Sequence, residues 1–218
     1  MSWGEVSKIN NNFNKTLNEQ ARELAYAGAY IFEKDTTFKP EKTGWYKVIV
    51  VGSGGETAVR NPSGGTNYFC SGGSGGVAIS TLHLSSAESY PVEVTGDQSS
   101  FNTTIIATAG TDGVVGSSYS RGDGGTAEGG DFNYNGIDGV SKSTSVQYGA
   151  YGDGVSVGVY IPELMRREVR VAYGDSVYEN IIGGYGILGY GASGGSCYGT
   201  ITPTGKGAVI IIPLELEE

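Results

Sequence analysis

Residues 43–55 read TGWYKVIVVGSGG, residues 71–84 read SGGSGGVAISTLHL, and these two stretches decide the fold. The run from Trp45 to Val51 consists mainly of β-branched and aromatic residues, which is typical of a strand buried on both faces. Glycines between the runs permit positive φ angles or close backbone approach, so we expect two strands joined by a surface excursion. The glycine pairs lie at positions 54–55, 64–65, 72–73 and 75–76.

Further apolar or alternating runs follow, with turn signals at a spacing that is typical of an antiparallel sandwich or jelly roll. The sequence therefore predicts a mainly β protein: a glycine-rich antiparallel β-sandwich or jelly-roll-like body with an N-terminal α-helical, coiled-coil segment. We expect residues 208–212 to form a buried closing strand that Pro213 ends. The other expected strands lie in residues 89–96, 99–110, 155–162 and 167–174.

Residues 3–31 repeat mostly apolar positions in two sets, each spaced by seven and offset by three, which is the a and d pattern of a coiled coil. Asn10 and Gln20 would form polar layers that fix the register of the helices. We expect residues 1–31 to trimerise and attach the protein, and residues 32–218 to form one glycine-rich β domain with long loops. A helix packed on its own domain is the alternative. The seam positions are Trp3, Val6, Asn10, Phe13, Leu17, Gln20, Leu24, Ala27 and Ile31.

Residues 111–154 and 183–200 are rich in glycine and tyrosine and contain hardly any continuous apolar run. Because such segments cannot build a core alone, we expect compact ordered loops packed on the β body. Tyrosine combines a flat apolar face with a hydroxyl group, so these loops are the expected recognition surface. Alternatively, the tyrosines seal the loops onto the body. The expected receptor-binding residues are Tyr119, Tyr134, Tyr148, Tyr151, Tyr185, Tyr190 and Tyr198.

The order of these motifs, GWYKVIVVGSGG followed by SGGSGGVAI and a leucine-bearing strand, resembles the glycine-rich tail-fibre and tail-tip domain of bacteriophages and phage-derived contractile particles. The resemblance covers residues 38–110 and, more loosely, the remainder to residue 212. It implies a receptor-binding protein of a virion or phage-like particle, assembled in bacterial cytoplasm and released extracellularly. The implied partners are two further copies in a homotrimer, other tail or baseplate proteins at the N-terminus, and a host-surface carbohydrate or protein.

Two other classes of function stay open. A purely structural virion component, such as a fibre connector or decoration protein, would share this fold without binding a ligand of its own. A tail-borne cell-wall hydrolase would need a catalytic constellation, and no pair of carboxylates in the sequence can be assigned the spacing that a glycosidase needs. The sequence therefore favours a binding protein over an enzyme.

The charge balance limits the partners further. The chain has 14 Lys and Arg residues against 23 Asp and Glu residues, a formal net charge of −9. Nucleic-acid binding draws its affinity from Lys and Arg, so neither nucleic acid nor an anionic membrane is an expected partner. No apolar stretch approaches the roughly 20 residues that cross a bilayer, and we expect no membrane insertion.

Few residues suggest catalysis or a cofactor. His83 is the single histidine and lies in an expected strand, and the glycine motifs lack the context of nucleotide-binding loops. Cys70 and Cys197 are expected to be reduced thiols, with a disulfide as the alternative. The RGD tripeptide at residues 121–123 is attributed to chance. We therefore expect no cofactor.

Residues 131–142 begin like a calcium-binding loop, but Lys142 occupies the position of the bidentate glutamate. This excludes an EF-hand. A looser oxygen-ligand site is a weak metal candidate, and an Asx-rich turn is the alternative. The candidate ligands are Asp131, Asn133, Asn135 and Asp138.

Overall fold

The computed structural model shows an antiparallel β protein, and the part of the chain that it describes contains strands but no helix. The predicted mainly β class is therefore confirmed. The described residues are 28–60, 67–144, 156–159, 165–171, 180–187, 191–193, 196–197, 200–201 and 204–217.

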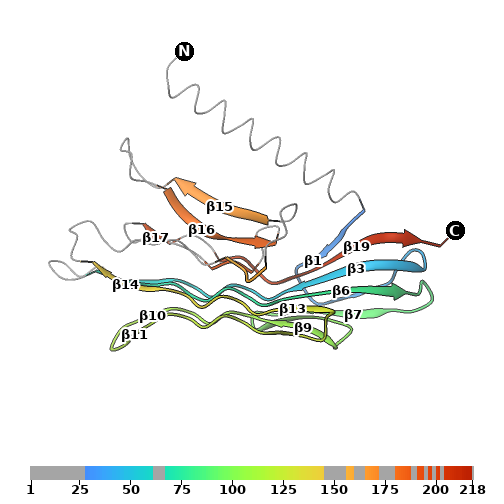
Figure 1. Ribbon diagram of the computed structural model, residues 1–218, viewed down its shortest axis with the longest axis horizontal. Coiled ribbons are helices and arrows are strands. Elements are labelled where there is room, and N and C mark those ends of the chain that lie inside the picture. Colours follow the sequence, from blue (N-terminus) through green and yellow to red (C-terminus); the bar gives the residue numbers. More distant parts are fainter. Residues whose placement is uncertain are drawn as a thin grey trace, which may run out of the picture.

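Two five-stranded sheets lie one above the other in the half of the protein that contains the C-terminus (Figure 1). The first sheet has the order β1 (Tyr30–Phe32), β19 (Ala208–Leu216), β3 (Gly44–Val51), β6 (Val77–Leu84) and β13 (Phe132–Tyr134). The second sheet has the order β12 (Ala127–Glu128), β9 (Ile105–Thr108), β8 (Gln98–Phe101), β7 (Tyr90–Val94) and β2 (Thr36–Phe38).

The apolar run in β3 packs on both faces of the first sheet. Tyr46, Val48 and Val50 face the second sheet and meet Val92, Phe101 and Ala107 in the main core. Ile49 and Val51 point to the opposite face, where they pack with Val77, Ile210 and Val157. Burial on both faces explains why this strand reads as a continuous rather than an alternating run.

The closing strand β19 lies between β1 and β3, with Ile211 opposite Val48 on one side and opposite Tyr30 on the other. Its predicted position inside the β core is confirmed. Pro213 does not end the strand, however. β19 continues to Leu216 through a register shift between Pro213 and Glu215, because a bulge accommodates a residue that cannot donate to the ladder.

Four smaller groups of strands complete the described structure. A third sheet has the order β14 (Ser141–Thr144), β5 (Asn67–Cys70) and β4 (Ala58–Arg60). The pairs are β10 (Val114–Val115) with β11 (Tyr119–Ser120), β15 (Met165–Val171) with β16 (Asn180–Ile187), and β17 (Ser196–Cys197) with β18 (Thr200–Ile201). All pairings are antiparallel.

Between the two main sheets and the third sheet, the chain forms a bundle of extended glycine-rich segments, seen as wavy ribbons in the middle of Figure 1. We call this unit the glycine bundle. Its central segment, residues 71–76, is buried at every position. The bundle comprises residues 52–57, 71–76, 109–113, 121–126, 135–140, 191–193 and 204–207.

Hydrogen bonds between the segments of the glycine bundle recur at every third residue. Gly73 and Gly76 donate to the carbonyls of Thr111 and Thr108, at 3.0 and 3.1 Å. Similarly, Ser71 and Ser74 donate to Val140 and Ile137, at 2.9 Å each. This period is that of a polyproline II-type conformation, which has three residues per turn and no hydrogen bonds of its own. The segments therefore satisfy their backbone groups through their neighbours.

Glycine is required in the bundle because the backbones touch. A Cβ atom added to Gly72 would overlap the backbone of Gly55, and one added to Gly75 would overlap the carbonyl of Gly52. Neither Gly72 nor Gly75 has a positive φ angle, so the requirement is space and not backbone conformation. The prediction that these glycines lie on a surface excursion is wrong for residues 71–76, which form the buried centre of the bundle.

Three further predictions need correction. Ile31 pairs with Ile210 in β1 and so cannot belong to a coiled-coil seam. Residues 156–159, predicted as strand, are irregular, with Val157 packed on the outer face of the first sheet. Residues 183–187, predicted as loop, lie in β16, which forms a separate two-stranded sheet with β15 instead of joining the main core.

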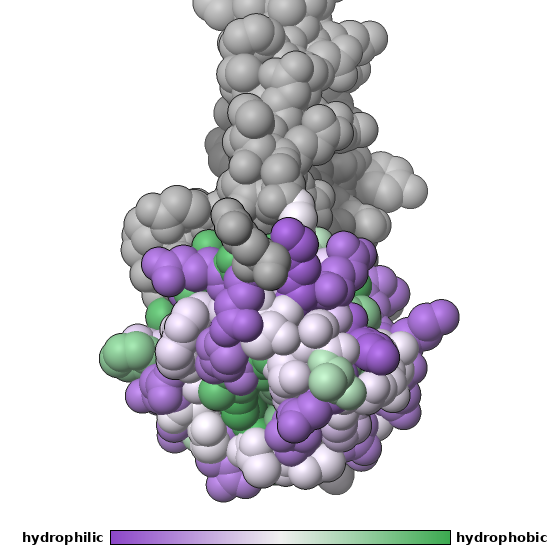
Figure 2. Space-filling view, turned by 90° about the vertical axis from the view of Figure 1, so that its right-hand side faces the viewer, coloured by the Kyte–Doolittle hydropathy of each residue, from purple (hydrophilic) through white to green (hydrophobic). Residues whose placement is uncertain are grey.

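The surface at the C-terminal end of the two main sheets is mostly hydrophilic, with apolar residues visible in small areas only (Figure 2). Within the described residues, no helix has the length and hydropathy needed to span a membrane.

Candidate functional site

The strands β10, β11 and β14 lie at the end of the protein opposite the end of β19 that leads to the C-terminus (Figure 1). β14 belongs to the third sheet with β5 and β4. We call β4, β5, β10, β11 and β14 together the far end. Because the glycine bundle links the far end to the main core through backbone hydrogen bonds, its position relative to that core is fixed.

Three side chains form a compact group at the far end. Arg60 and Tyr68 lie directly opposite each other on β4 and β5. The Tyr119 ring, from β11, stacks on the Tyr68 ring with 3.9 Å between centroids and an angle of 14° between the planes. The Arg60 guanidinium also donates a hydrogen bond from Nη1 to the Tyr119 hydroxyl, at 2.8 Å. The group thus joins a cation and two aromatic rings.

The far half of the protein also exposes large apolar side chains. Val114 is 46% exposed and Tyr119 is 39% exposed, both in the β10–β11 hairpin. Ile137 and Val140, in the glycine bundle, are exposed as well. Exposed apolar side chains are a feature of contact surfaces, and Val114 lies in the same hairpin as Tyr119.

The structure places the predicted receptor-binding tyrosines in different settings. Tyr119 is exposed at the far end. Tyr134 is half-buried and packs on the apolar cluster at the outer face of the first sheet. The backbone of Tyr185 lies in β16. Tyr148, Tyr151, Tyr190 and Tyr198 lie outside the described residues, as do the predicted trimerisation residues Trp3, Val6, Asn10, Phe13, Leu17, Gln20 and Leu24.

The four side chains of the weak metal candidate do not converge. Asp131 accepts a hydrogen bond from the Thr81 backbone at 2.8 Å, and this bond, with one from the Ser80 hydroxyl, lowers the pKa of the Asp131 carboxyl. Asn133 bonds the backbone of Gly130, and Asn135 accepts from the Ala127 backbone. Only the Asn133 bonds are local, as in an Asx-rich turn. Asp131 and Asn135 instead bond the backbones of other segments, so the side chains are used to join segments. Among the described residues, no three His, Cys, Asp or Glu side chains are placed to hold a metal ion.

Asp138, the fourth candidate ligand, is paired with Arg121. Its two oxygens accept from the Arg121 guanidinium and from the Gly124 backbone, both at 3.0 Å. The arginine of the RGD tripeptide is therefore held by a carboxylate on the protein itself, which agrees with the interpretation of this tripeptide as a chance match.

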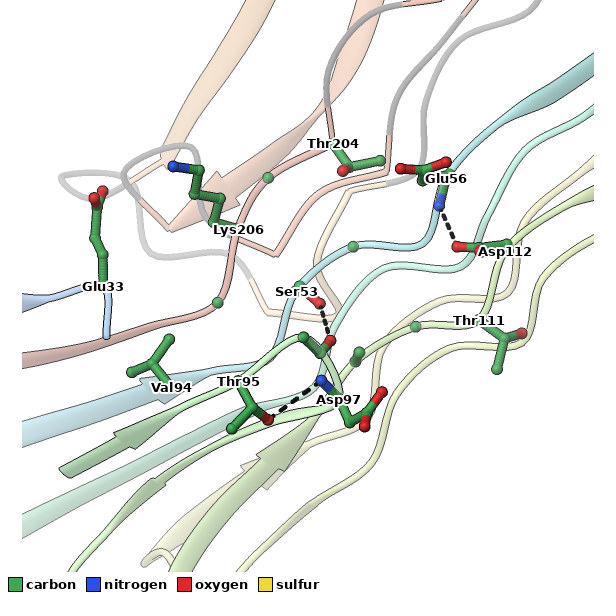
Figure 3. Close-up of a pocket in the computed structure, with 16 residues that line it drawn as sticks. Glu33, Ser53, Glu56, Val94, Thr95, Asp97, Thr111, Asp112, Thr204 and Lys206 are labelled. Atoms are coloured by element: carbon green, nitrogen blue, oxygen red, sulfur yellow. Dashed lines mark hydrogen bonds between the residues drawn. The ribbon is translucent and has the colours of Figure 1, made fainter. Parts of the chain in front are cut away.

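A polar cleft of about 740 Å³ opens beside the glycine bundle. Figure 3 shows Glu33 and Lys206 on one side of it, with Asp112 close to the backbone of Glu56 and Asp97 near Thr95. The lining contains four carboxylates and one lysine. With this excess of negative charge, the cleft disfavours anionic ligands.

The remaining sequence candidates lie elsewhere. Cys70 is a free, buried thiol, and burial raises its pKa, which disfavours the reactive thiolate. His83 lies in β6 as expected and contacts Glu217 at 3.0 Å, with both side chains largely exposed.

Sequence reasoning missed Arg60 and Tyr68. Arg60 contacts Tyr119 across 59 positions of sequence, and nothing in the local pattern around either residue signals that contact. Tyr68 lies beside Phe69, between the glycine pairs at 64–65 and 72–73, and this aromatic pair in a glycine-rich segment was the one available hint. The sequence matches no protein-family model and no curated protein.

Proposed function

We propose that the protein is a receptor-binding tip or tail-fibre protein of a phage or phage-like particle, and that it binds the host cell surface through its far end. The observation that supports this best is the combination of a rigid glycine bundle with exposed aromatic and apolar residues beyond it. A rigid support favours binding, because contact residues that are already ordered lose little conformational entropy when they bind.

The proposal includes two further features of the molecule. The body is jelly-roll-like, and an N-terminal coiled coil ends before β1. In this arrangement the N-terminal segment attaches the protein to the particle, while the far end, opposite the C-terminal end of β19, faces the host (Figure 1).

We expect the full chain to form a homotrimer. Light scattering should give about three times 22.7 kDa, because the repeated positions of residues 3–24 predict a self-associating seam. Replacing Leu17 and Leu24 together with Asp should weaken assembly, since two charges would enter an apolar seam. A monomer of the unaltered chain at micromolar concentration would contradict the expected oligomer.

Replacing Tyr119 with Ala should reduce binding to whole host cells by about 1–3 kcal/mol, as is typical of aromatic contact residues. The melting temperature should fall less than for a core residue, because Tyr119 is 39% exposed and its contacts with Tyr68 and Arg60 lie at the surface. Cell binding and thermal unfolding would be measured on the same samples, with purified cell walls and protein-stripped cells as the alternative targets.

Tyr134 supplies the matched control for this experiment. Its ring packs on the apolar cluster of the first sheet, so Tyr134→Ala should lower the melting temperature, and it should weaken cell binding only as far as it unfolds the protein. If Tyr119→Ala behaved in the same way, the tyrosines would act as seals. That outcome would favour the second candidate, a structural virion component. For Tyr134 itself, the packing on the apolar cluster already indicates a structural role.

A further inference from the structure

Arg60 is the only arginine among the described residues of the far end, and its guanidinium is bonded to a neutral group. Its Nη1 atom donates to the Tyr119 hydroxyl at 2.8 Å. Arg121, by contrast, is neutralised by Asp138 at 3.0 Å. Within the described residues Arg60 makes no ion pair, although the chain contains 23 acidic residues against 14 basic ones.

The sequence next to Arg60 does not supply a counter-charge either. Residues 61–66 read NPSGGT and contain no acidic residue. On the neighbouring strands, the positions in line with Arg60 are Tyr68 and Ser143, which are both uncharged. Because the paired positions on these described strands carry no charge, the Arg60 guanidinium is available to a negatively charged ligand.

The two tyrosines hold this arginine in place. The Tyr68 ring backs the Tyr119 ring at 3.9 Å, and the Tyr119 hydroxyl accepts one of the five N–H groups of the guanidinium. Among the residues that the structure describes, no other acceptor binds this guanidinium. Its other N–H groups can therefore bind a planar or tetrahedral anion in a forked geometry. The Tyr119 hydroxyl also keeps its own proton for donation to a ligand oxygen.

We infer that Arg60, Tyr68 and Tyr119 form a binding site for a saccharide that bears a carboxylate or phosphate group. The guanidinium binds the anionic group, and the exposed Tyr119 side chain provides an apolar face and a hydroxyl beside it for the sugar ring. This inference rests on the proposed function, because it names the ligand class of the proposed host-binding surface. Elsewhere the net charge of −9 repels anionic surfaces, and the polar cleft with its four carboxylates cannot substitute for this site.

The test uses galacturonic acid and glucose 1-phosphate as probes, with galactose and glucose as neutral controls. Titration into the full chain would be followed by NMR of tyrosine ring resonances, with Tyr119 assigned from Tyr119→Phe. We expect both charged sugars, or one of them, to shift the Tyr119 signal saturably, and the neutral sugars to bind at least about 10-fold more weakly. The two probes distinguish a uronic acid from a sugar phosphate as the source of the anion.

The decisive variant is Arg60→Gln, which should weaken binding of the charged sugar by about 10- to 100-fold, the usual effect of losing a charge-assisted hydrogen bond. Arg60→Lys keeps the charge but loses the forked geometry, so its affinity for the charged sugar should lie between those of the unaltered chain and Arg60→Gln. Lys47→Gln is the matched control, because it removes one positive charge from an exposed position in β3 and should leave binding unchanged. Thermal unfolding of each variant confirms that it is folded.

Equal binding of charged and neutral sugars, no saturable shift with either charged sugar, or unchanged affinity in a folded Arg60→Gln variant would each overturn the inference. Cell binding distinguishes it from the proposed function. If the protein binds host cells and Arg60→Gln binds them equally well, the anionic-saccharide site is wrong and the receptor-binding proposal stands. If galacturonic acid binds through Arg60 but no host cell is bound, the site stands and the proposed function fails.

Discussion

Replacing Gly75 with Ala should destabilise the protein by about 4 kcal/mol or more, measured as the free energy of unfolding in urea. The added Cβ atom would overlap the backbone carbonyl of Gly52. The Gly75 amide also donates to the carbonyl of Gly191 at 2.7 Å, so the segment cannot move aside without breaking a buried hydrogen bond. Because a domain of this kind is stable by only about 5–15 kcal/mol, the variant should lose a large part of its stability and unfold at a much lower urea concentration.

Gly96→Ala is the control for this substitution. Gly96 lies in the exposed turn between β7 and β8, and a Cβ atom added there would meet no other atom within 4 Å. Its replacement should be neutral or stabilising by about 0.4–1 kcal/mol through the unfolded chain. Equal melting of the Gly75→Ala and Gly96→Ala variants would show that the glycine bundle is not close-packed.

The main core was predictable because apolar burial leaves a local pattern. Val48 to Val51 read as a continuous apolar run since this strand is buried on both faces, and β6 and β19 show the same kind of signal. The heptad interpretation was wrong at Ile31, where the local pattern is ambiguous. A single apolar residue fits both a helical seam and a strand, and pairing with Ile210 decided between them.

The glycine bundle left no local signal beyond composition. Its hydrogen bonds connect positions such as Gly75 and Gly191, or Ser71 and Val140, that are far apart in the sequence. Segments without apolar side chains read as loops, although here the backbones themselves form the packed interior. The candidate site is similar, because Arg60 and Tyr119 become neighbours only when the β10–β11 hairpin lies against β4 and β5.

Removing residues 208–218 should abolish folding of the main core. Val209, Ile210 and Ile211 are fully buried, and burial of each aliphatic side chain contributes about 1.5–3 kcal/mol. The loss of three such residues, about 5–9 kcal/mol, is comparable with the whole stability of a domain. The truncated chain would also leave β3 unpaired along one edge and β1 without a partner, since β19 lies between them.

Circular dichroism and thermal melting would measure this effect, with a chain lacking only residues 217–218 as the control. That shorter deletion removes the exposed contact between Glu217 and His83 and the bond from the Glu217 amide to the Thr43 carbonyl, a change of about 1 kcal/mol. It should therefore melt near the parent. Suppose that the chain without residues 208–218 still melted cooperatively at the parent temperature. β19 would then not be an integral strand of the core, because losing an integral strand exposes both β3 and the apolar face that Ile211 covers.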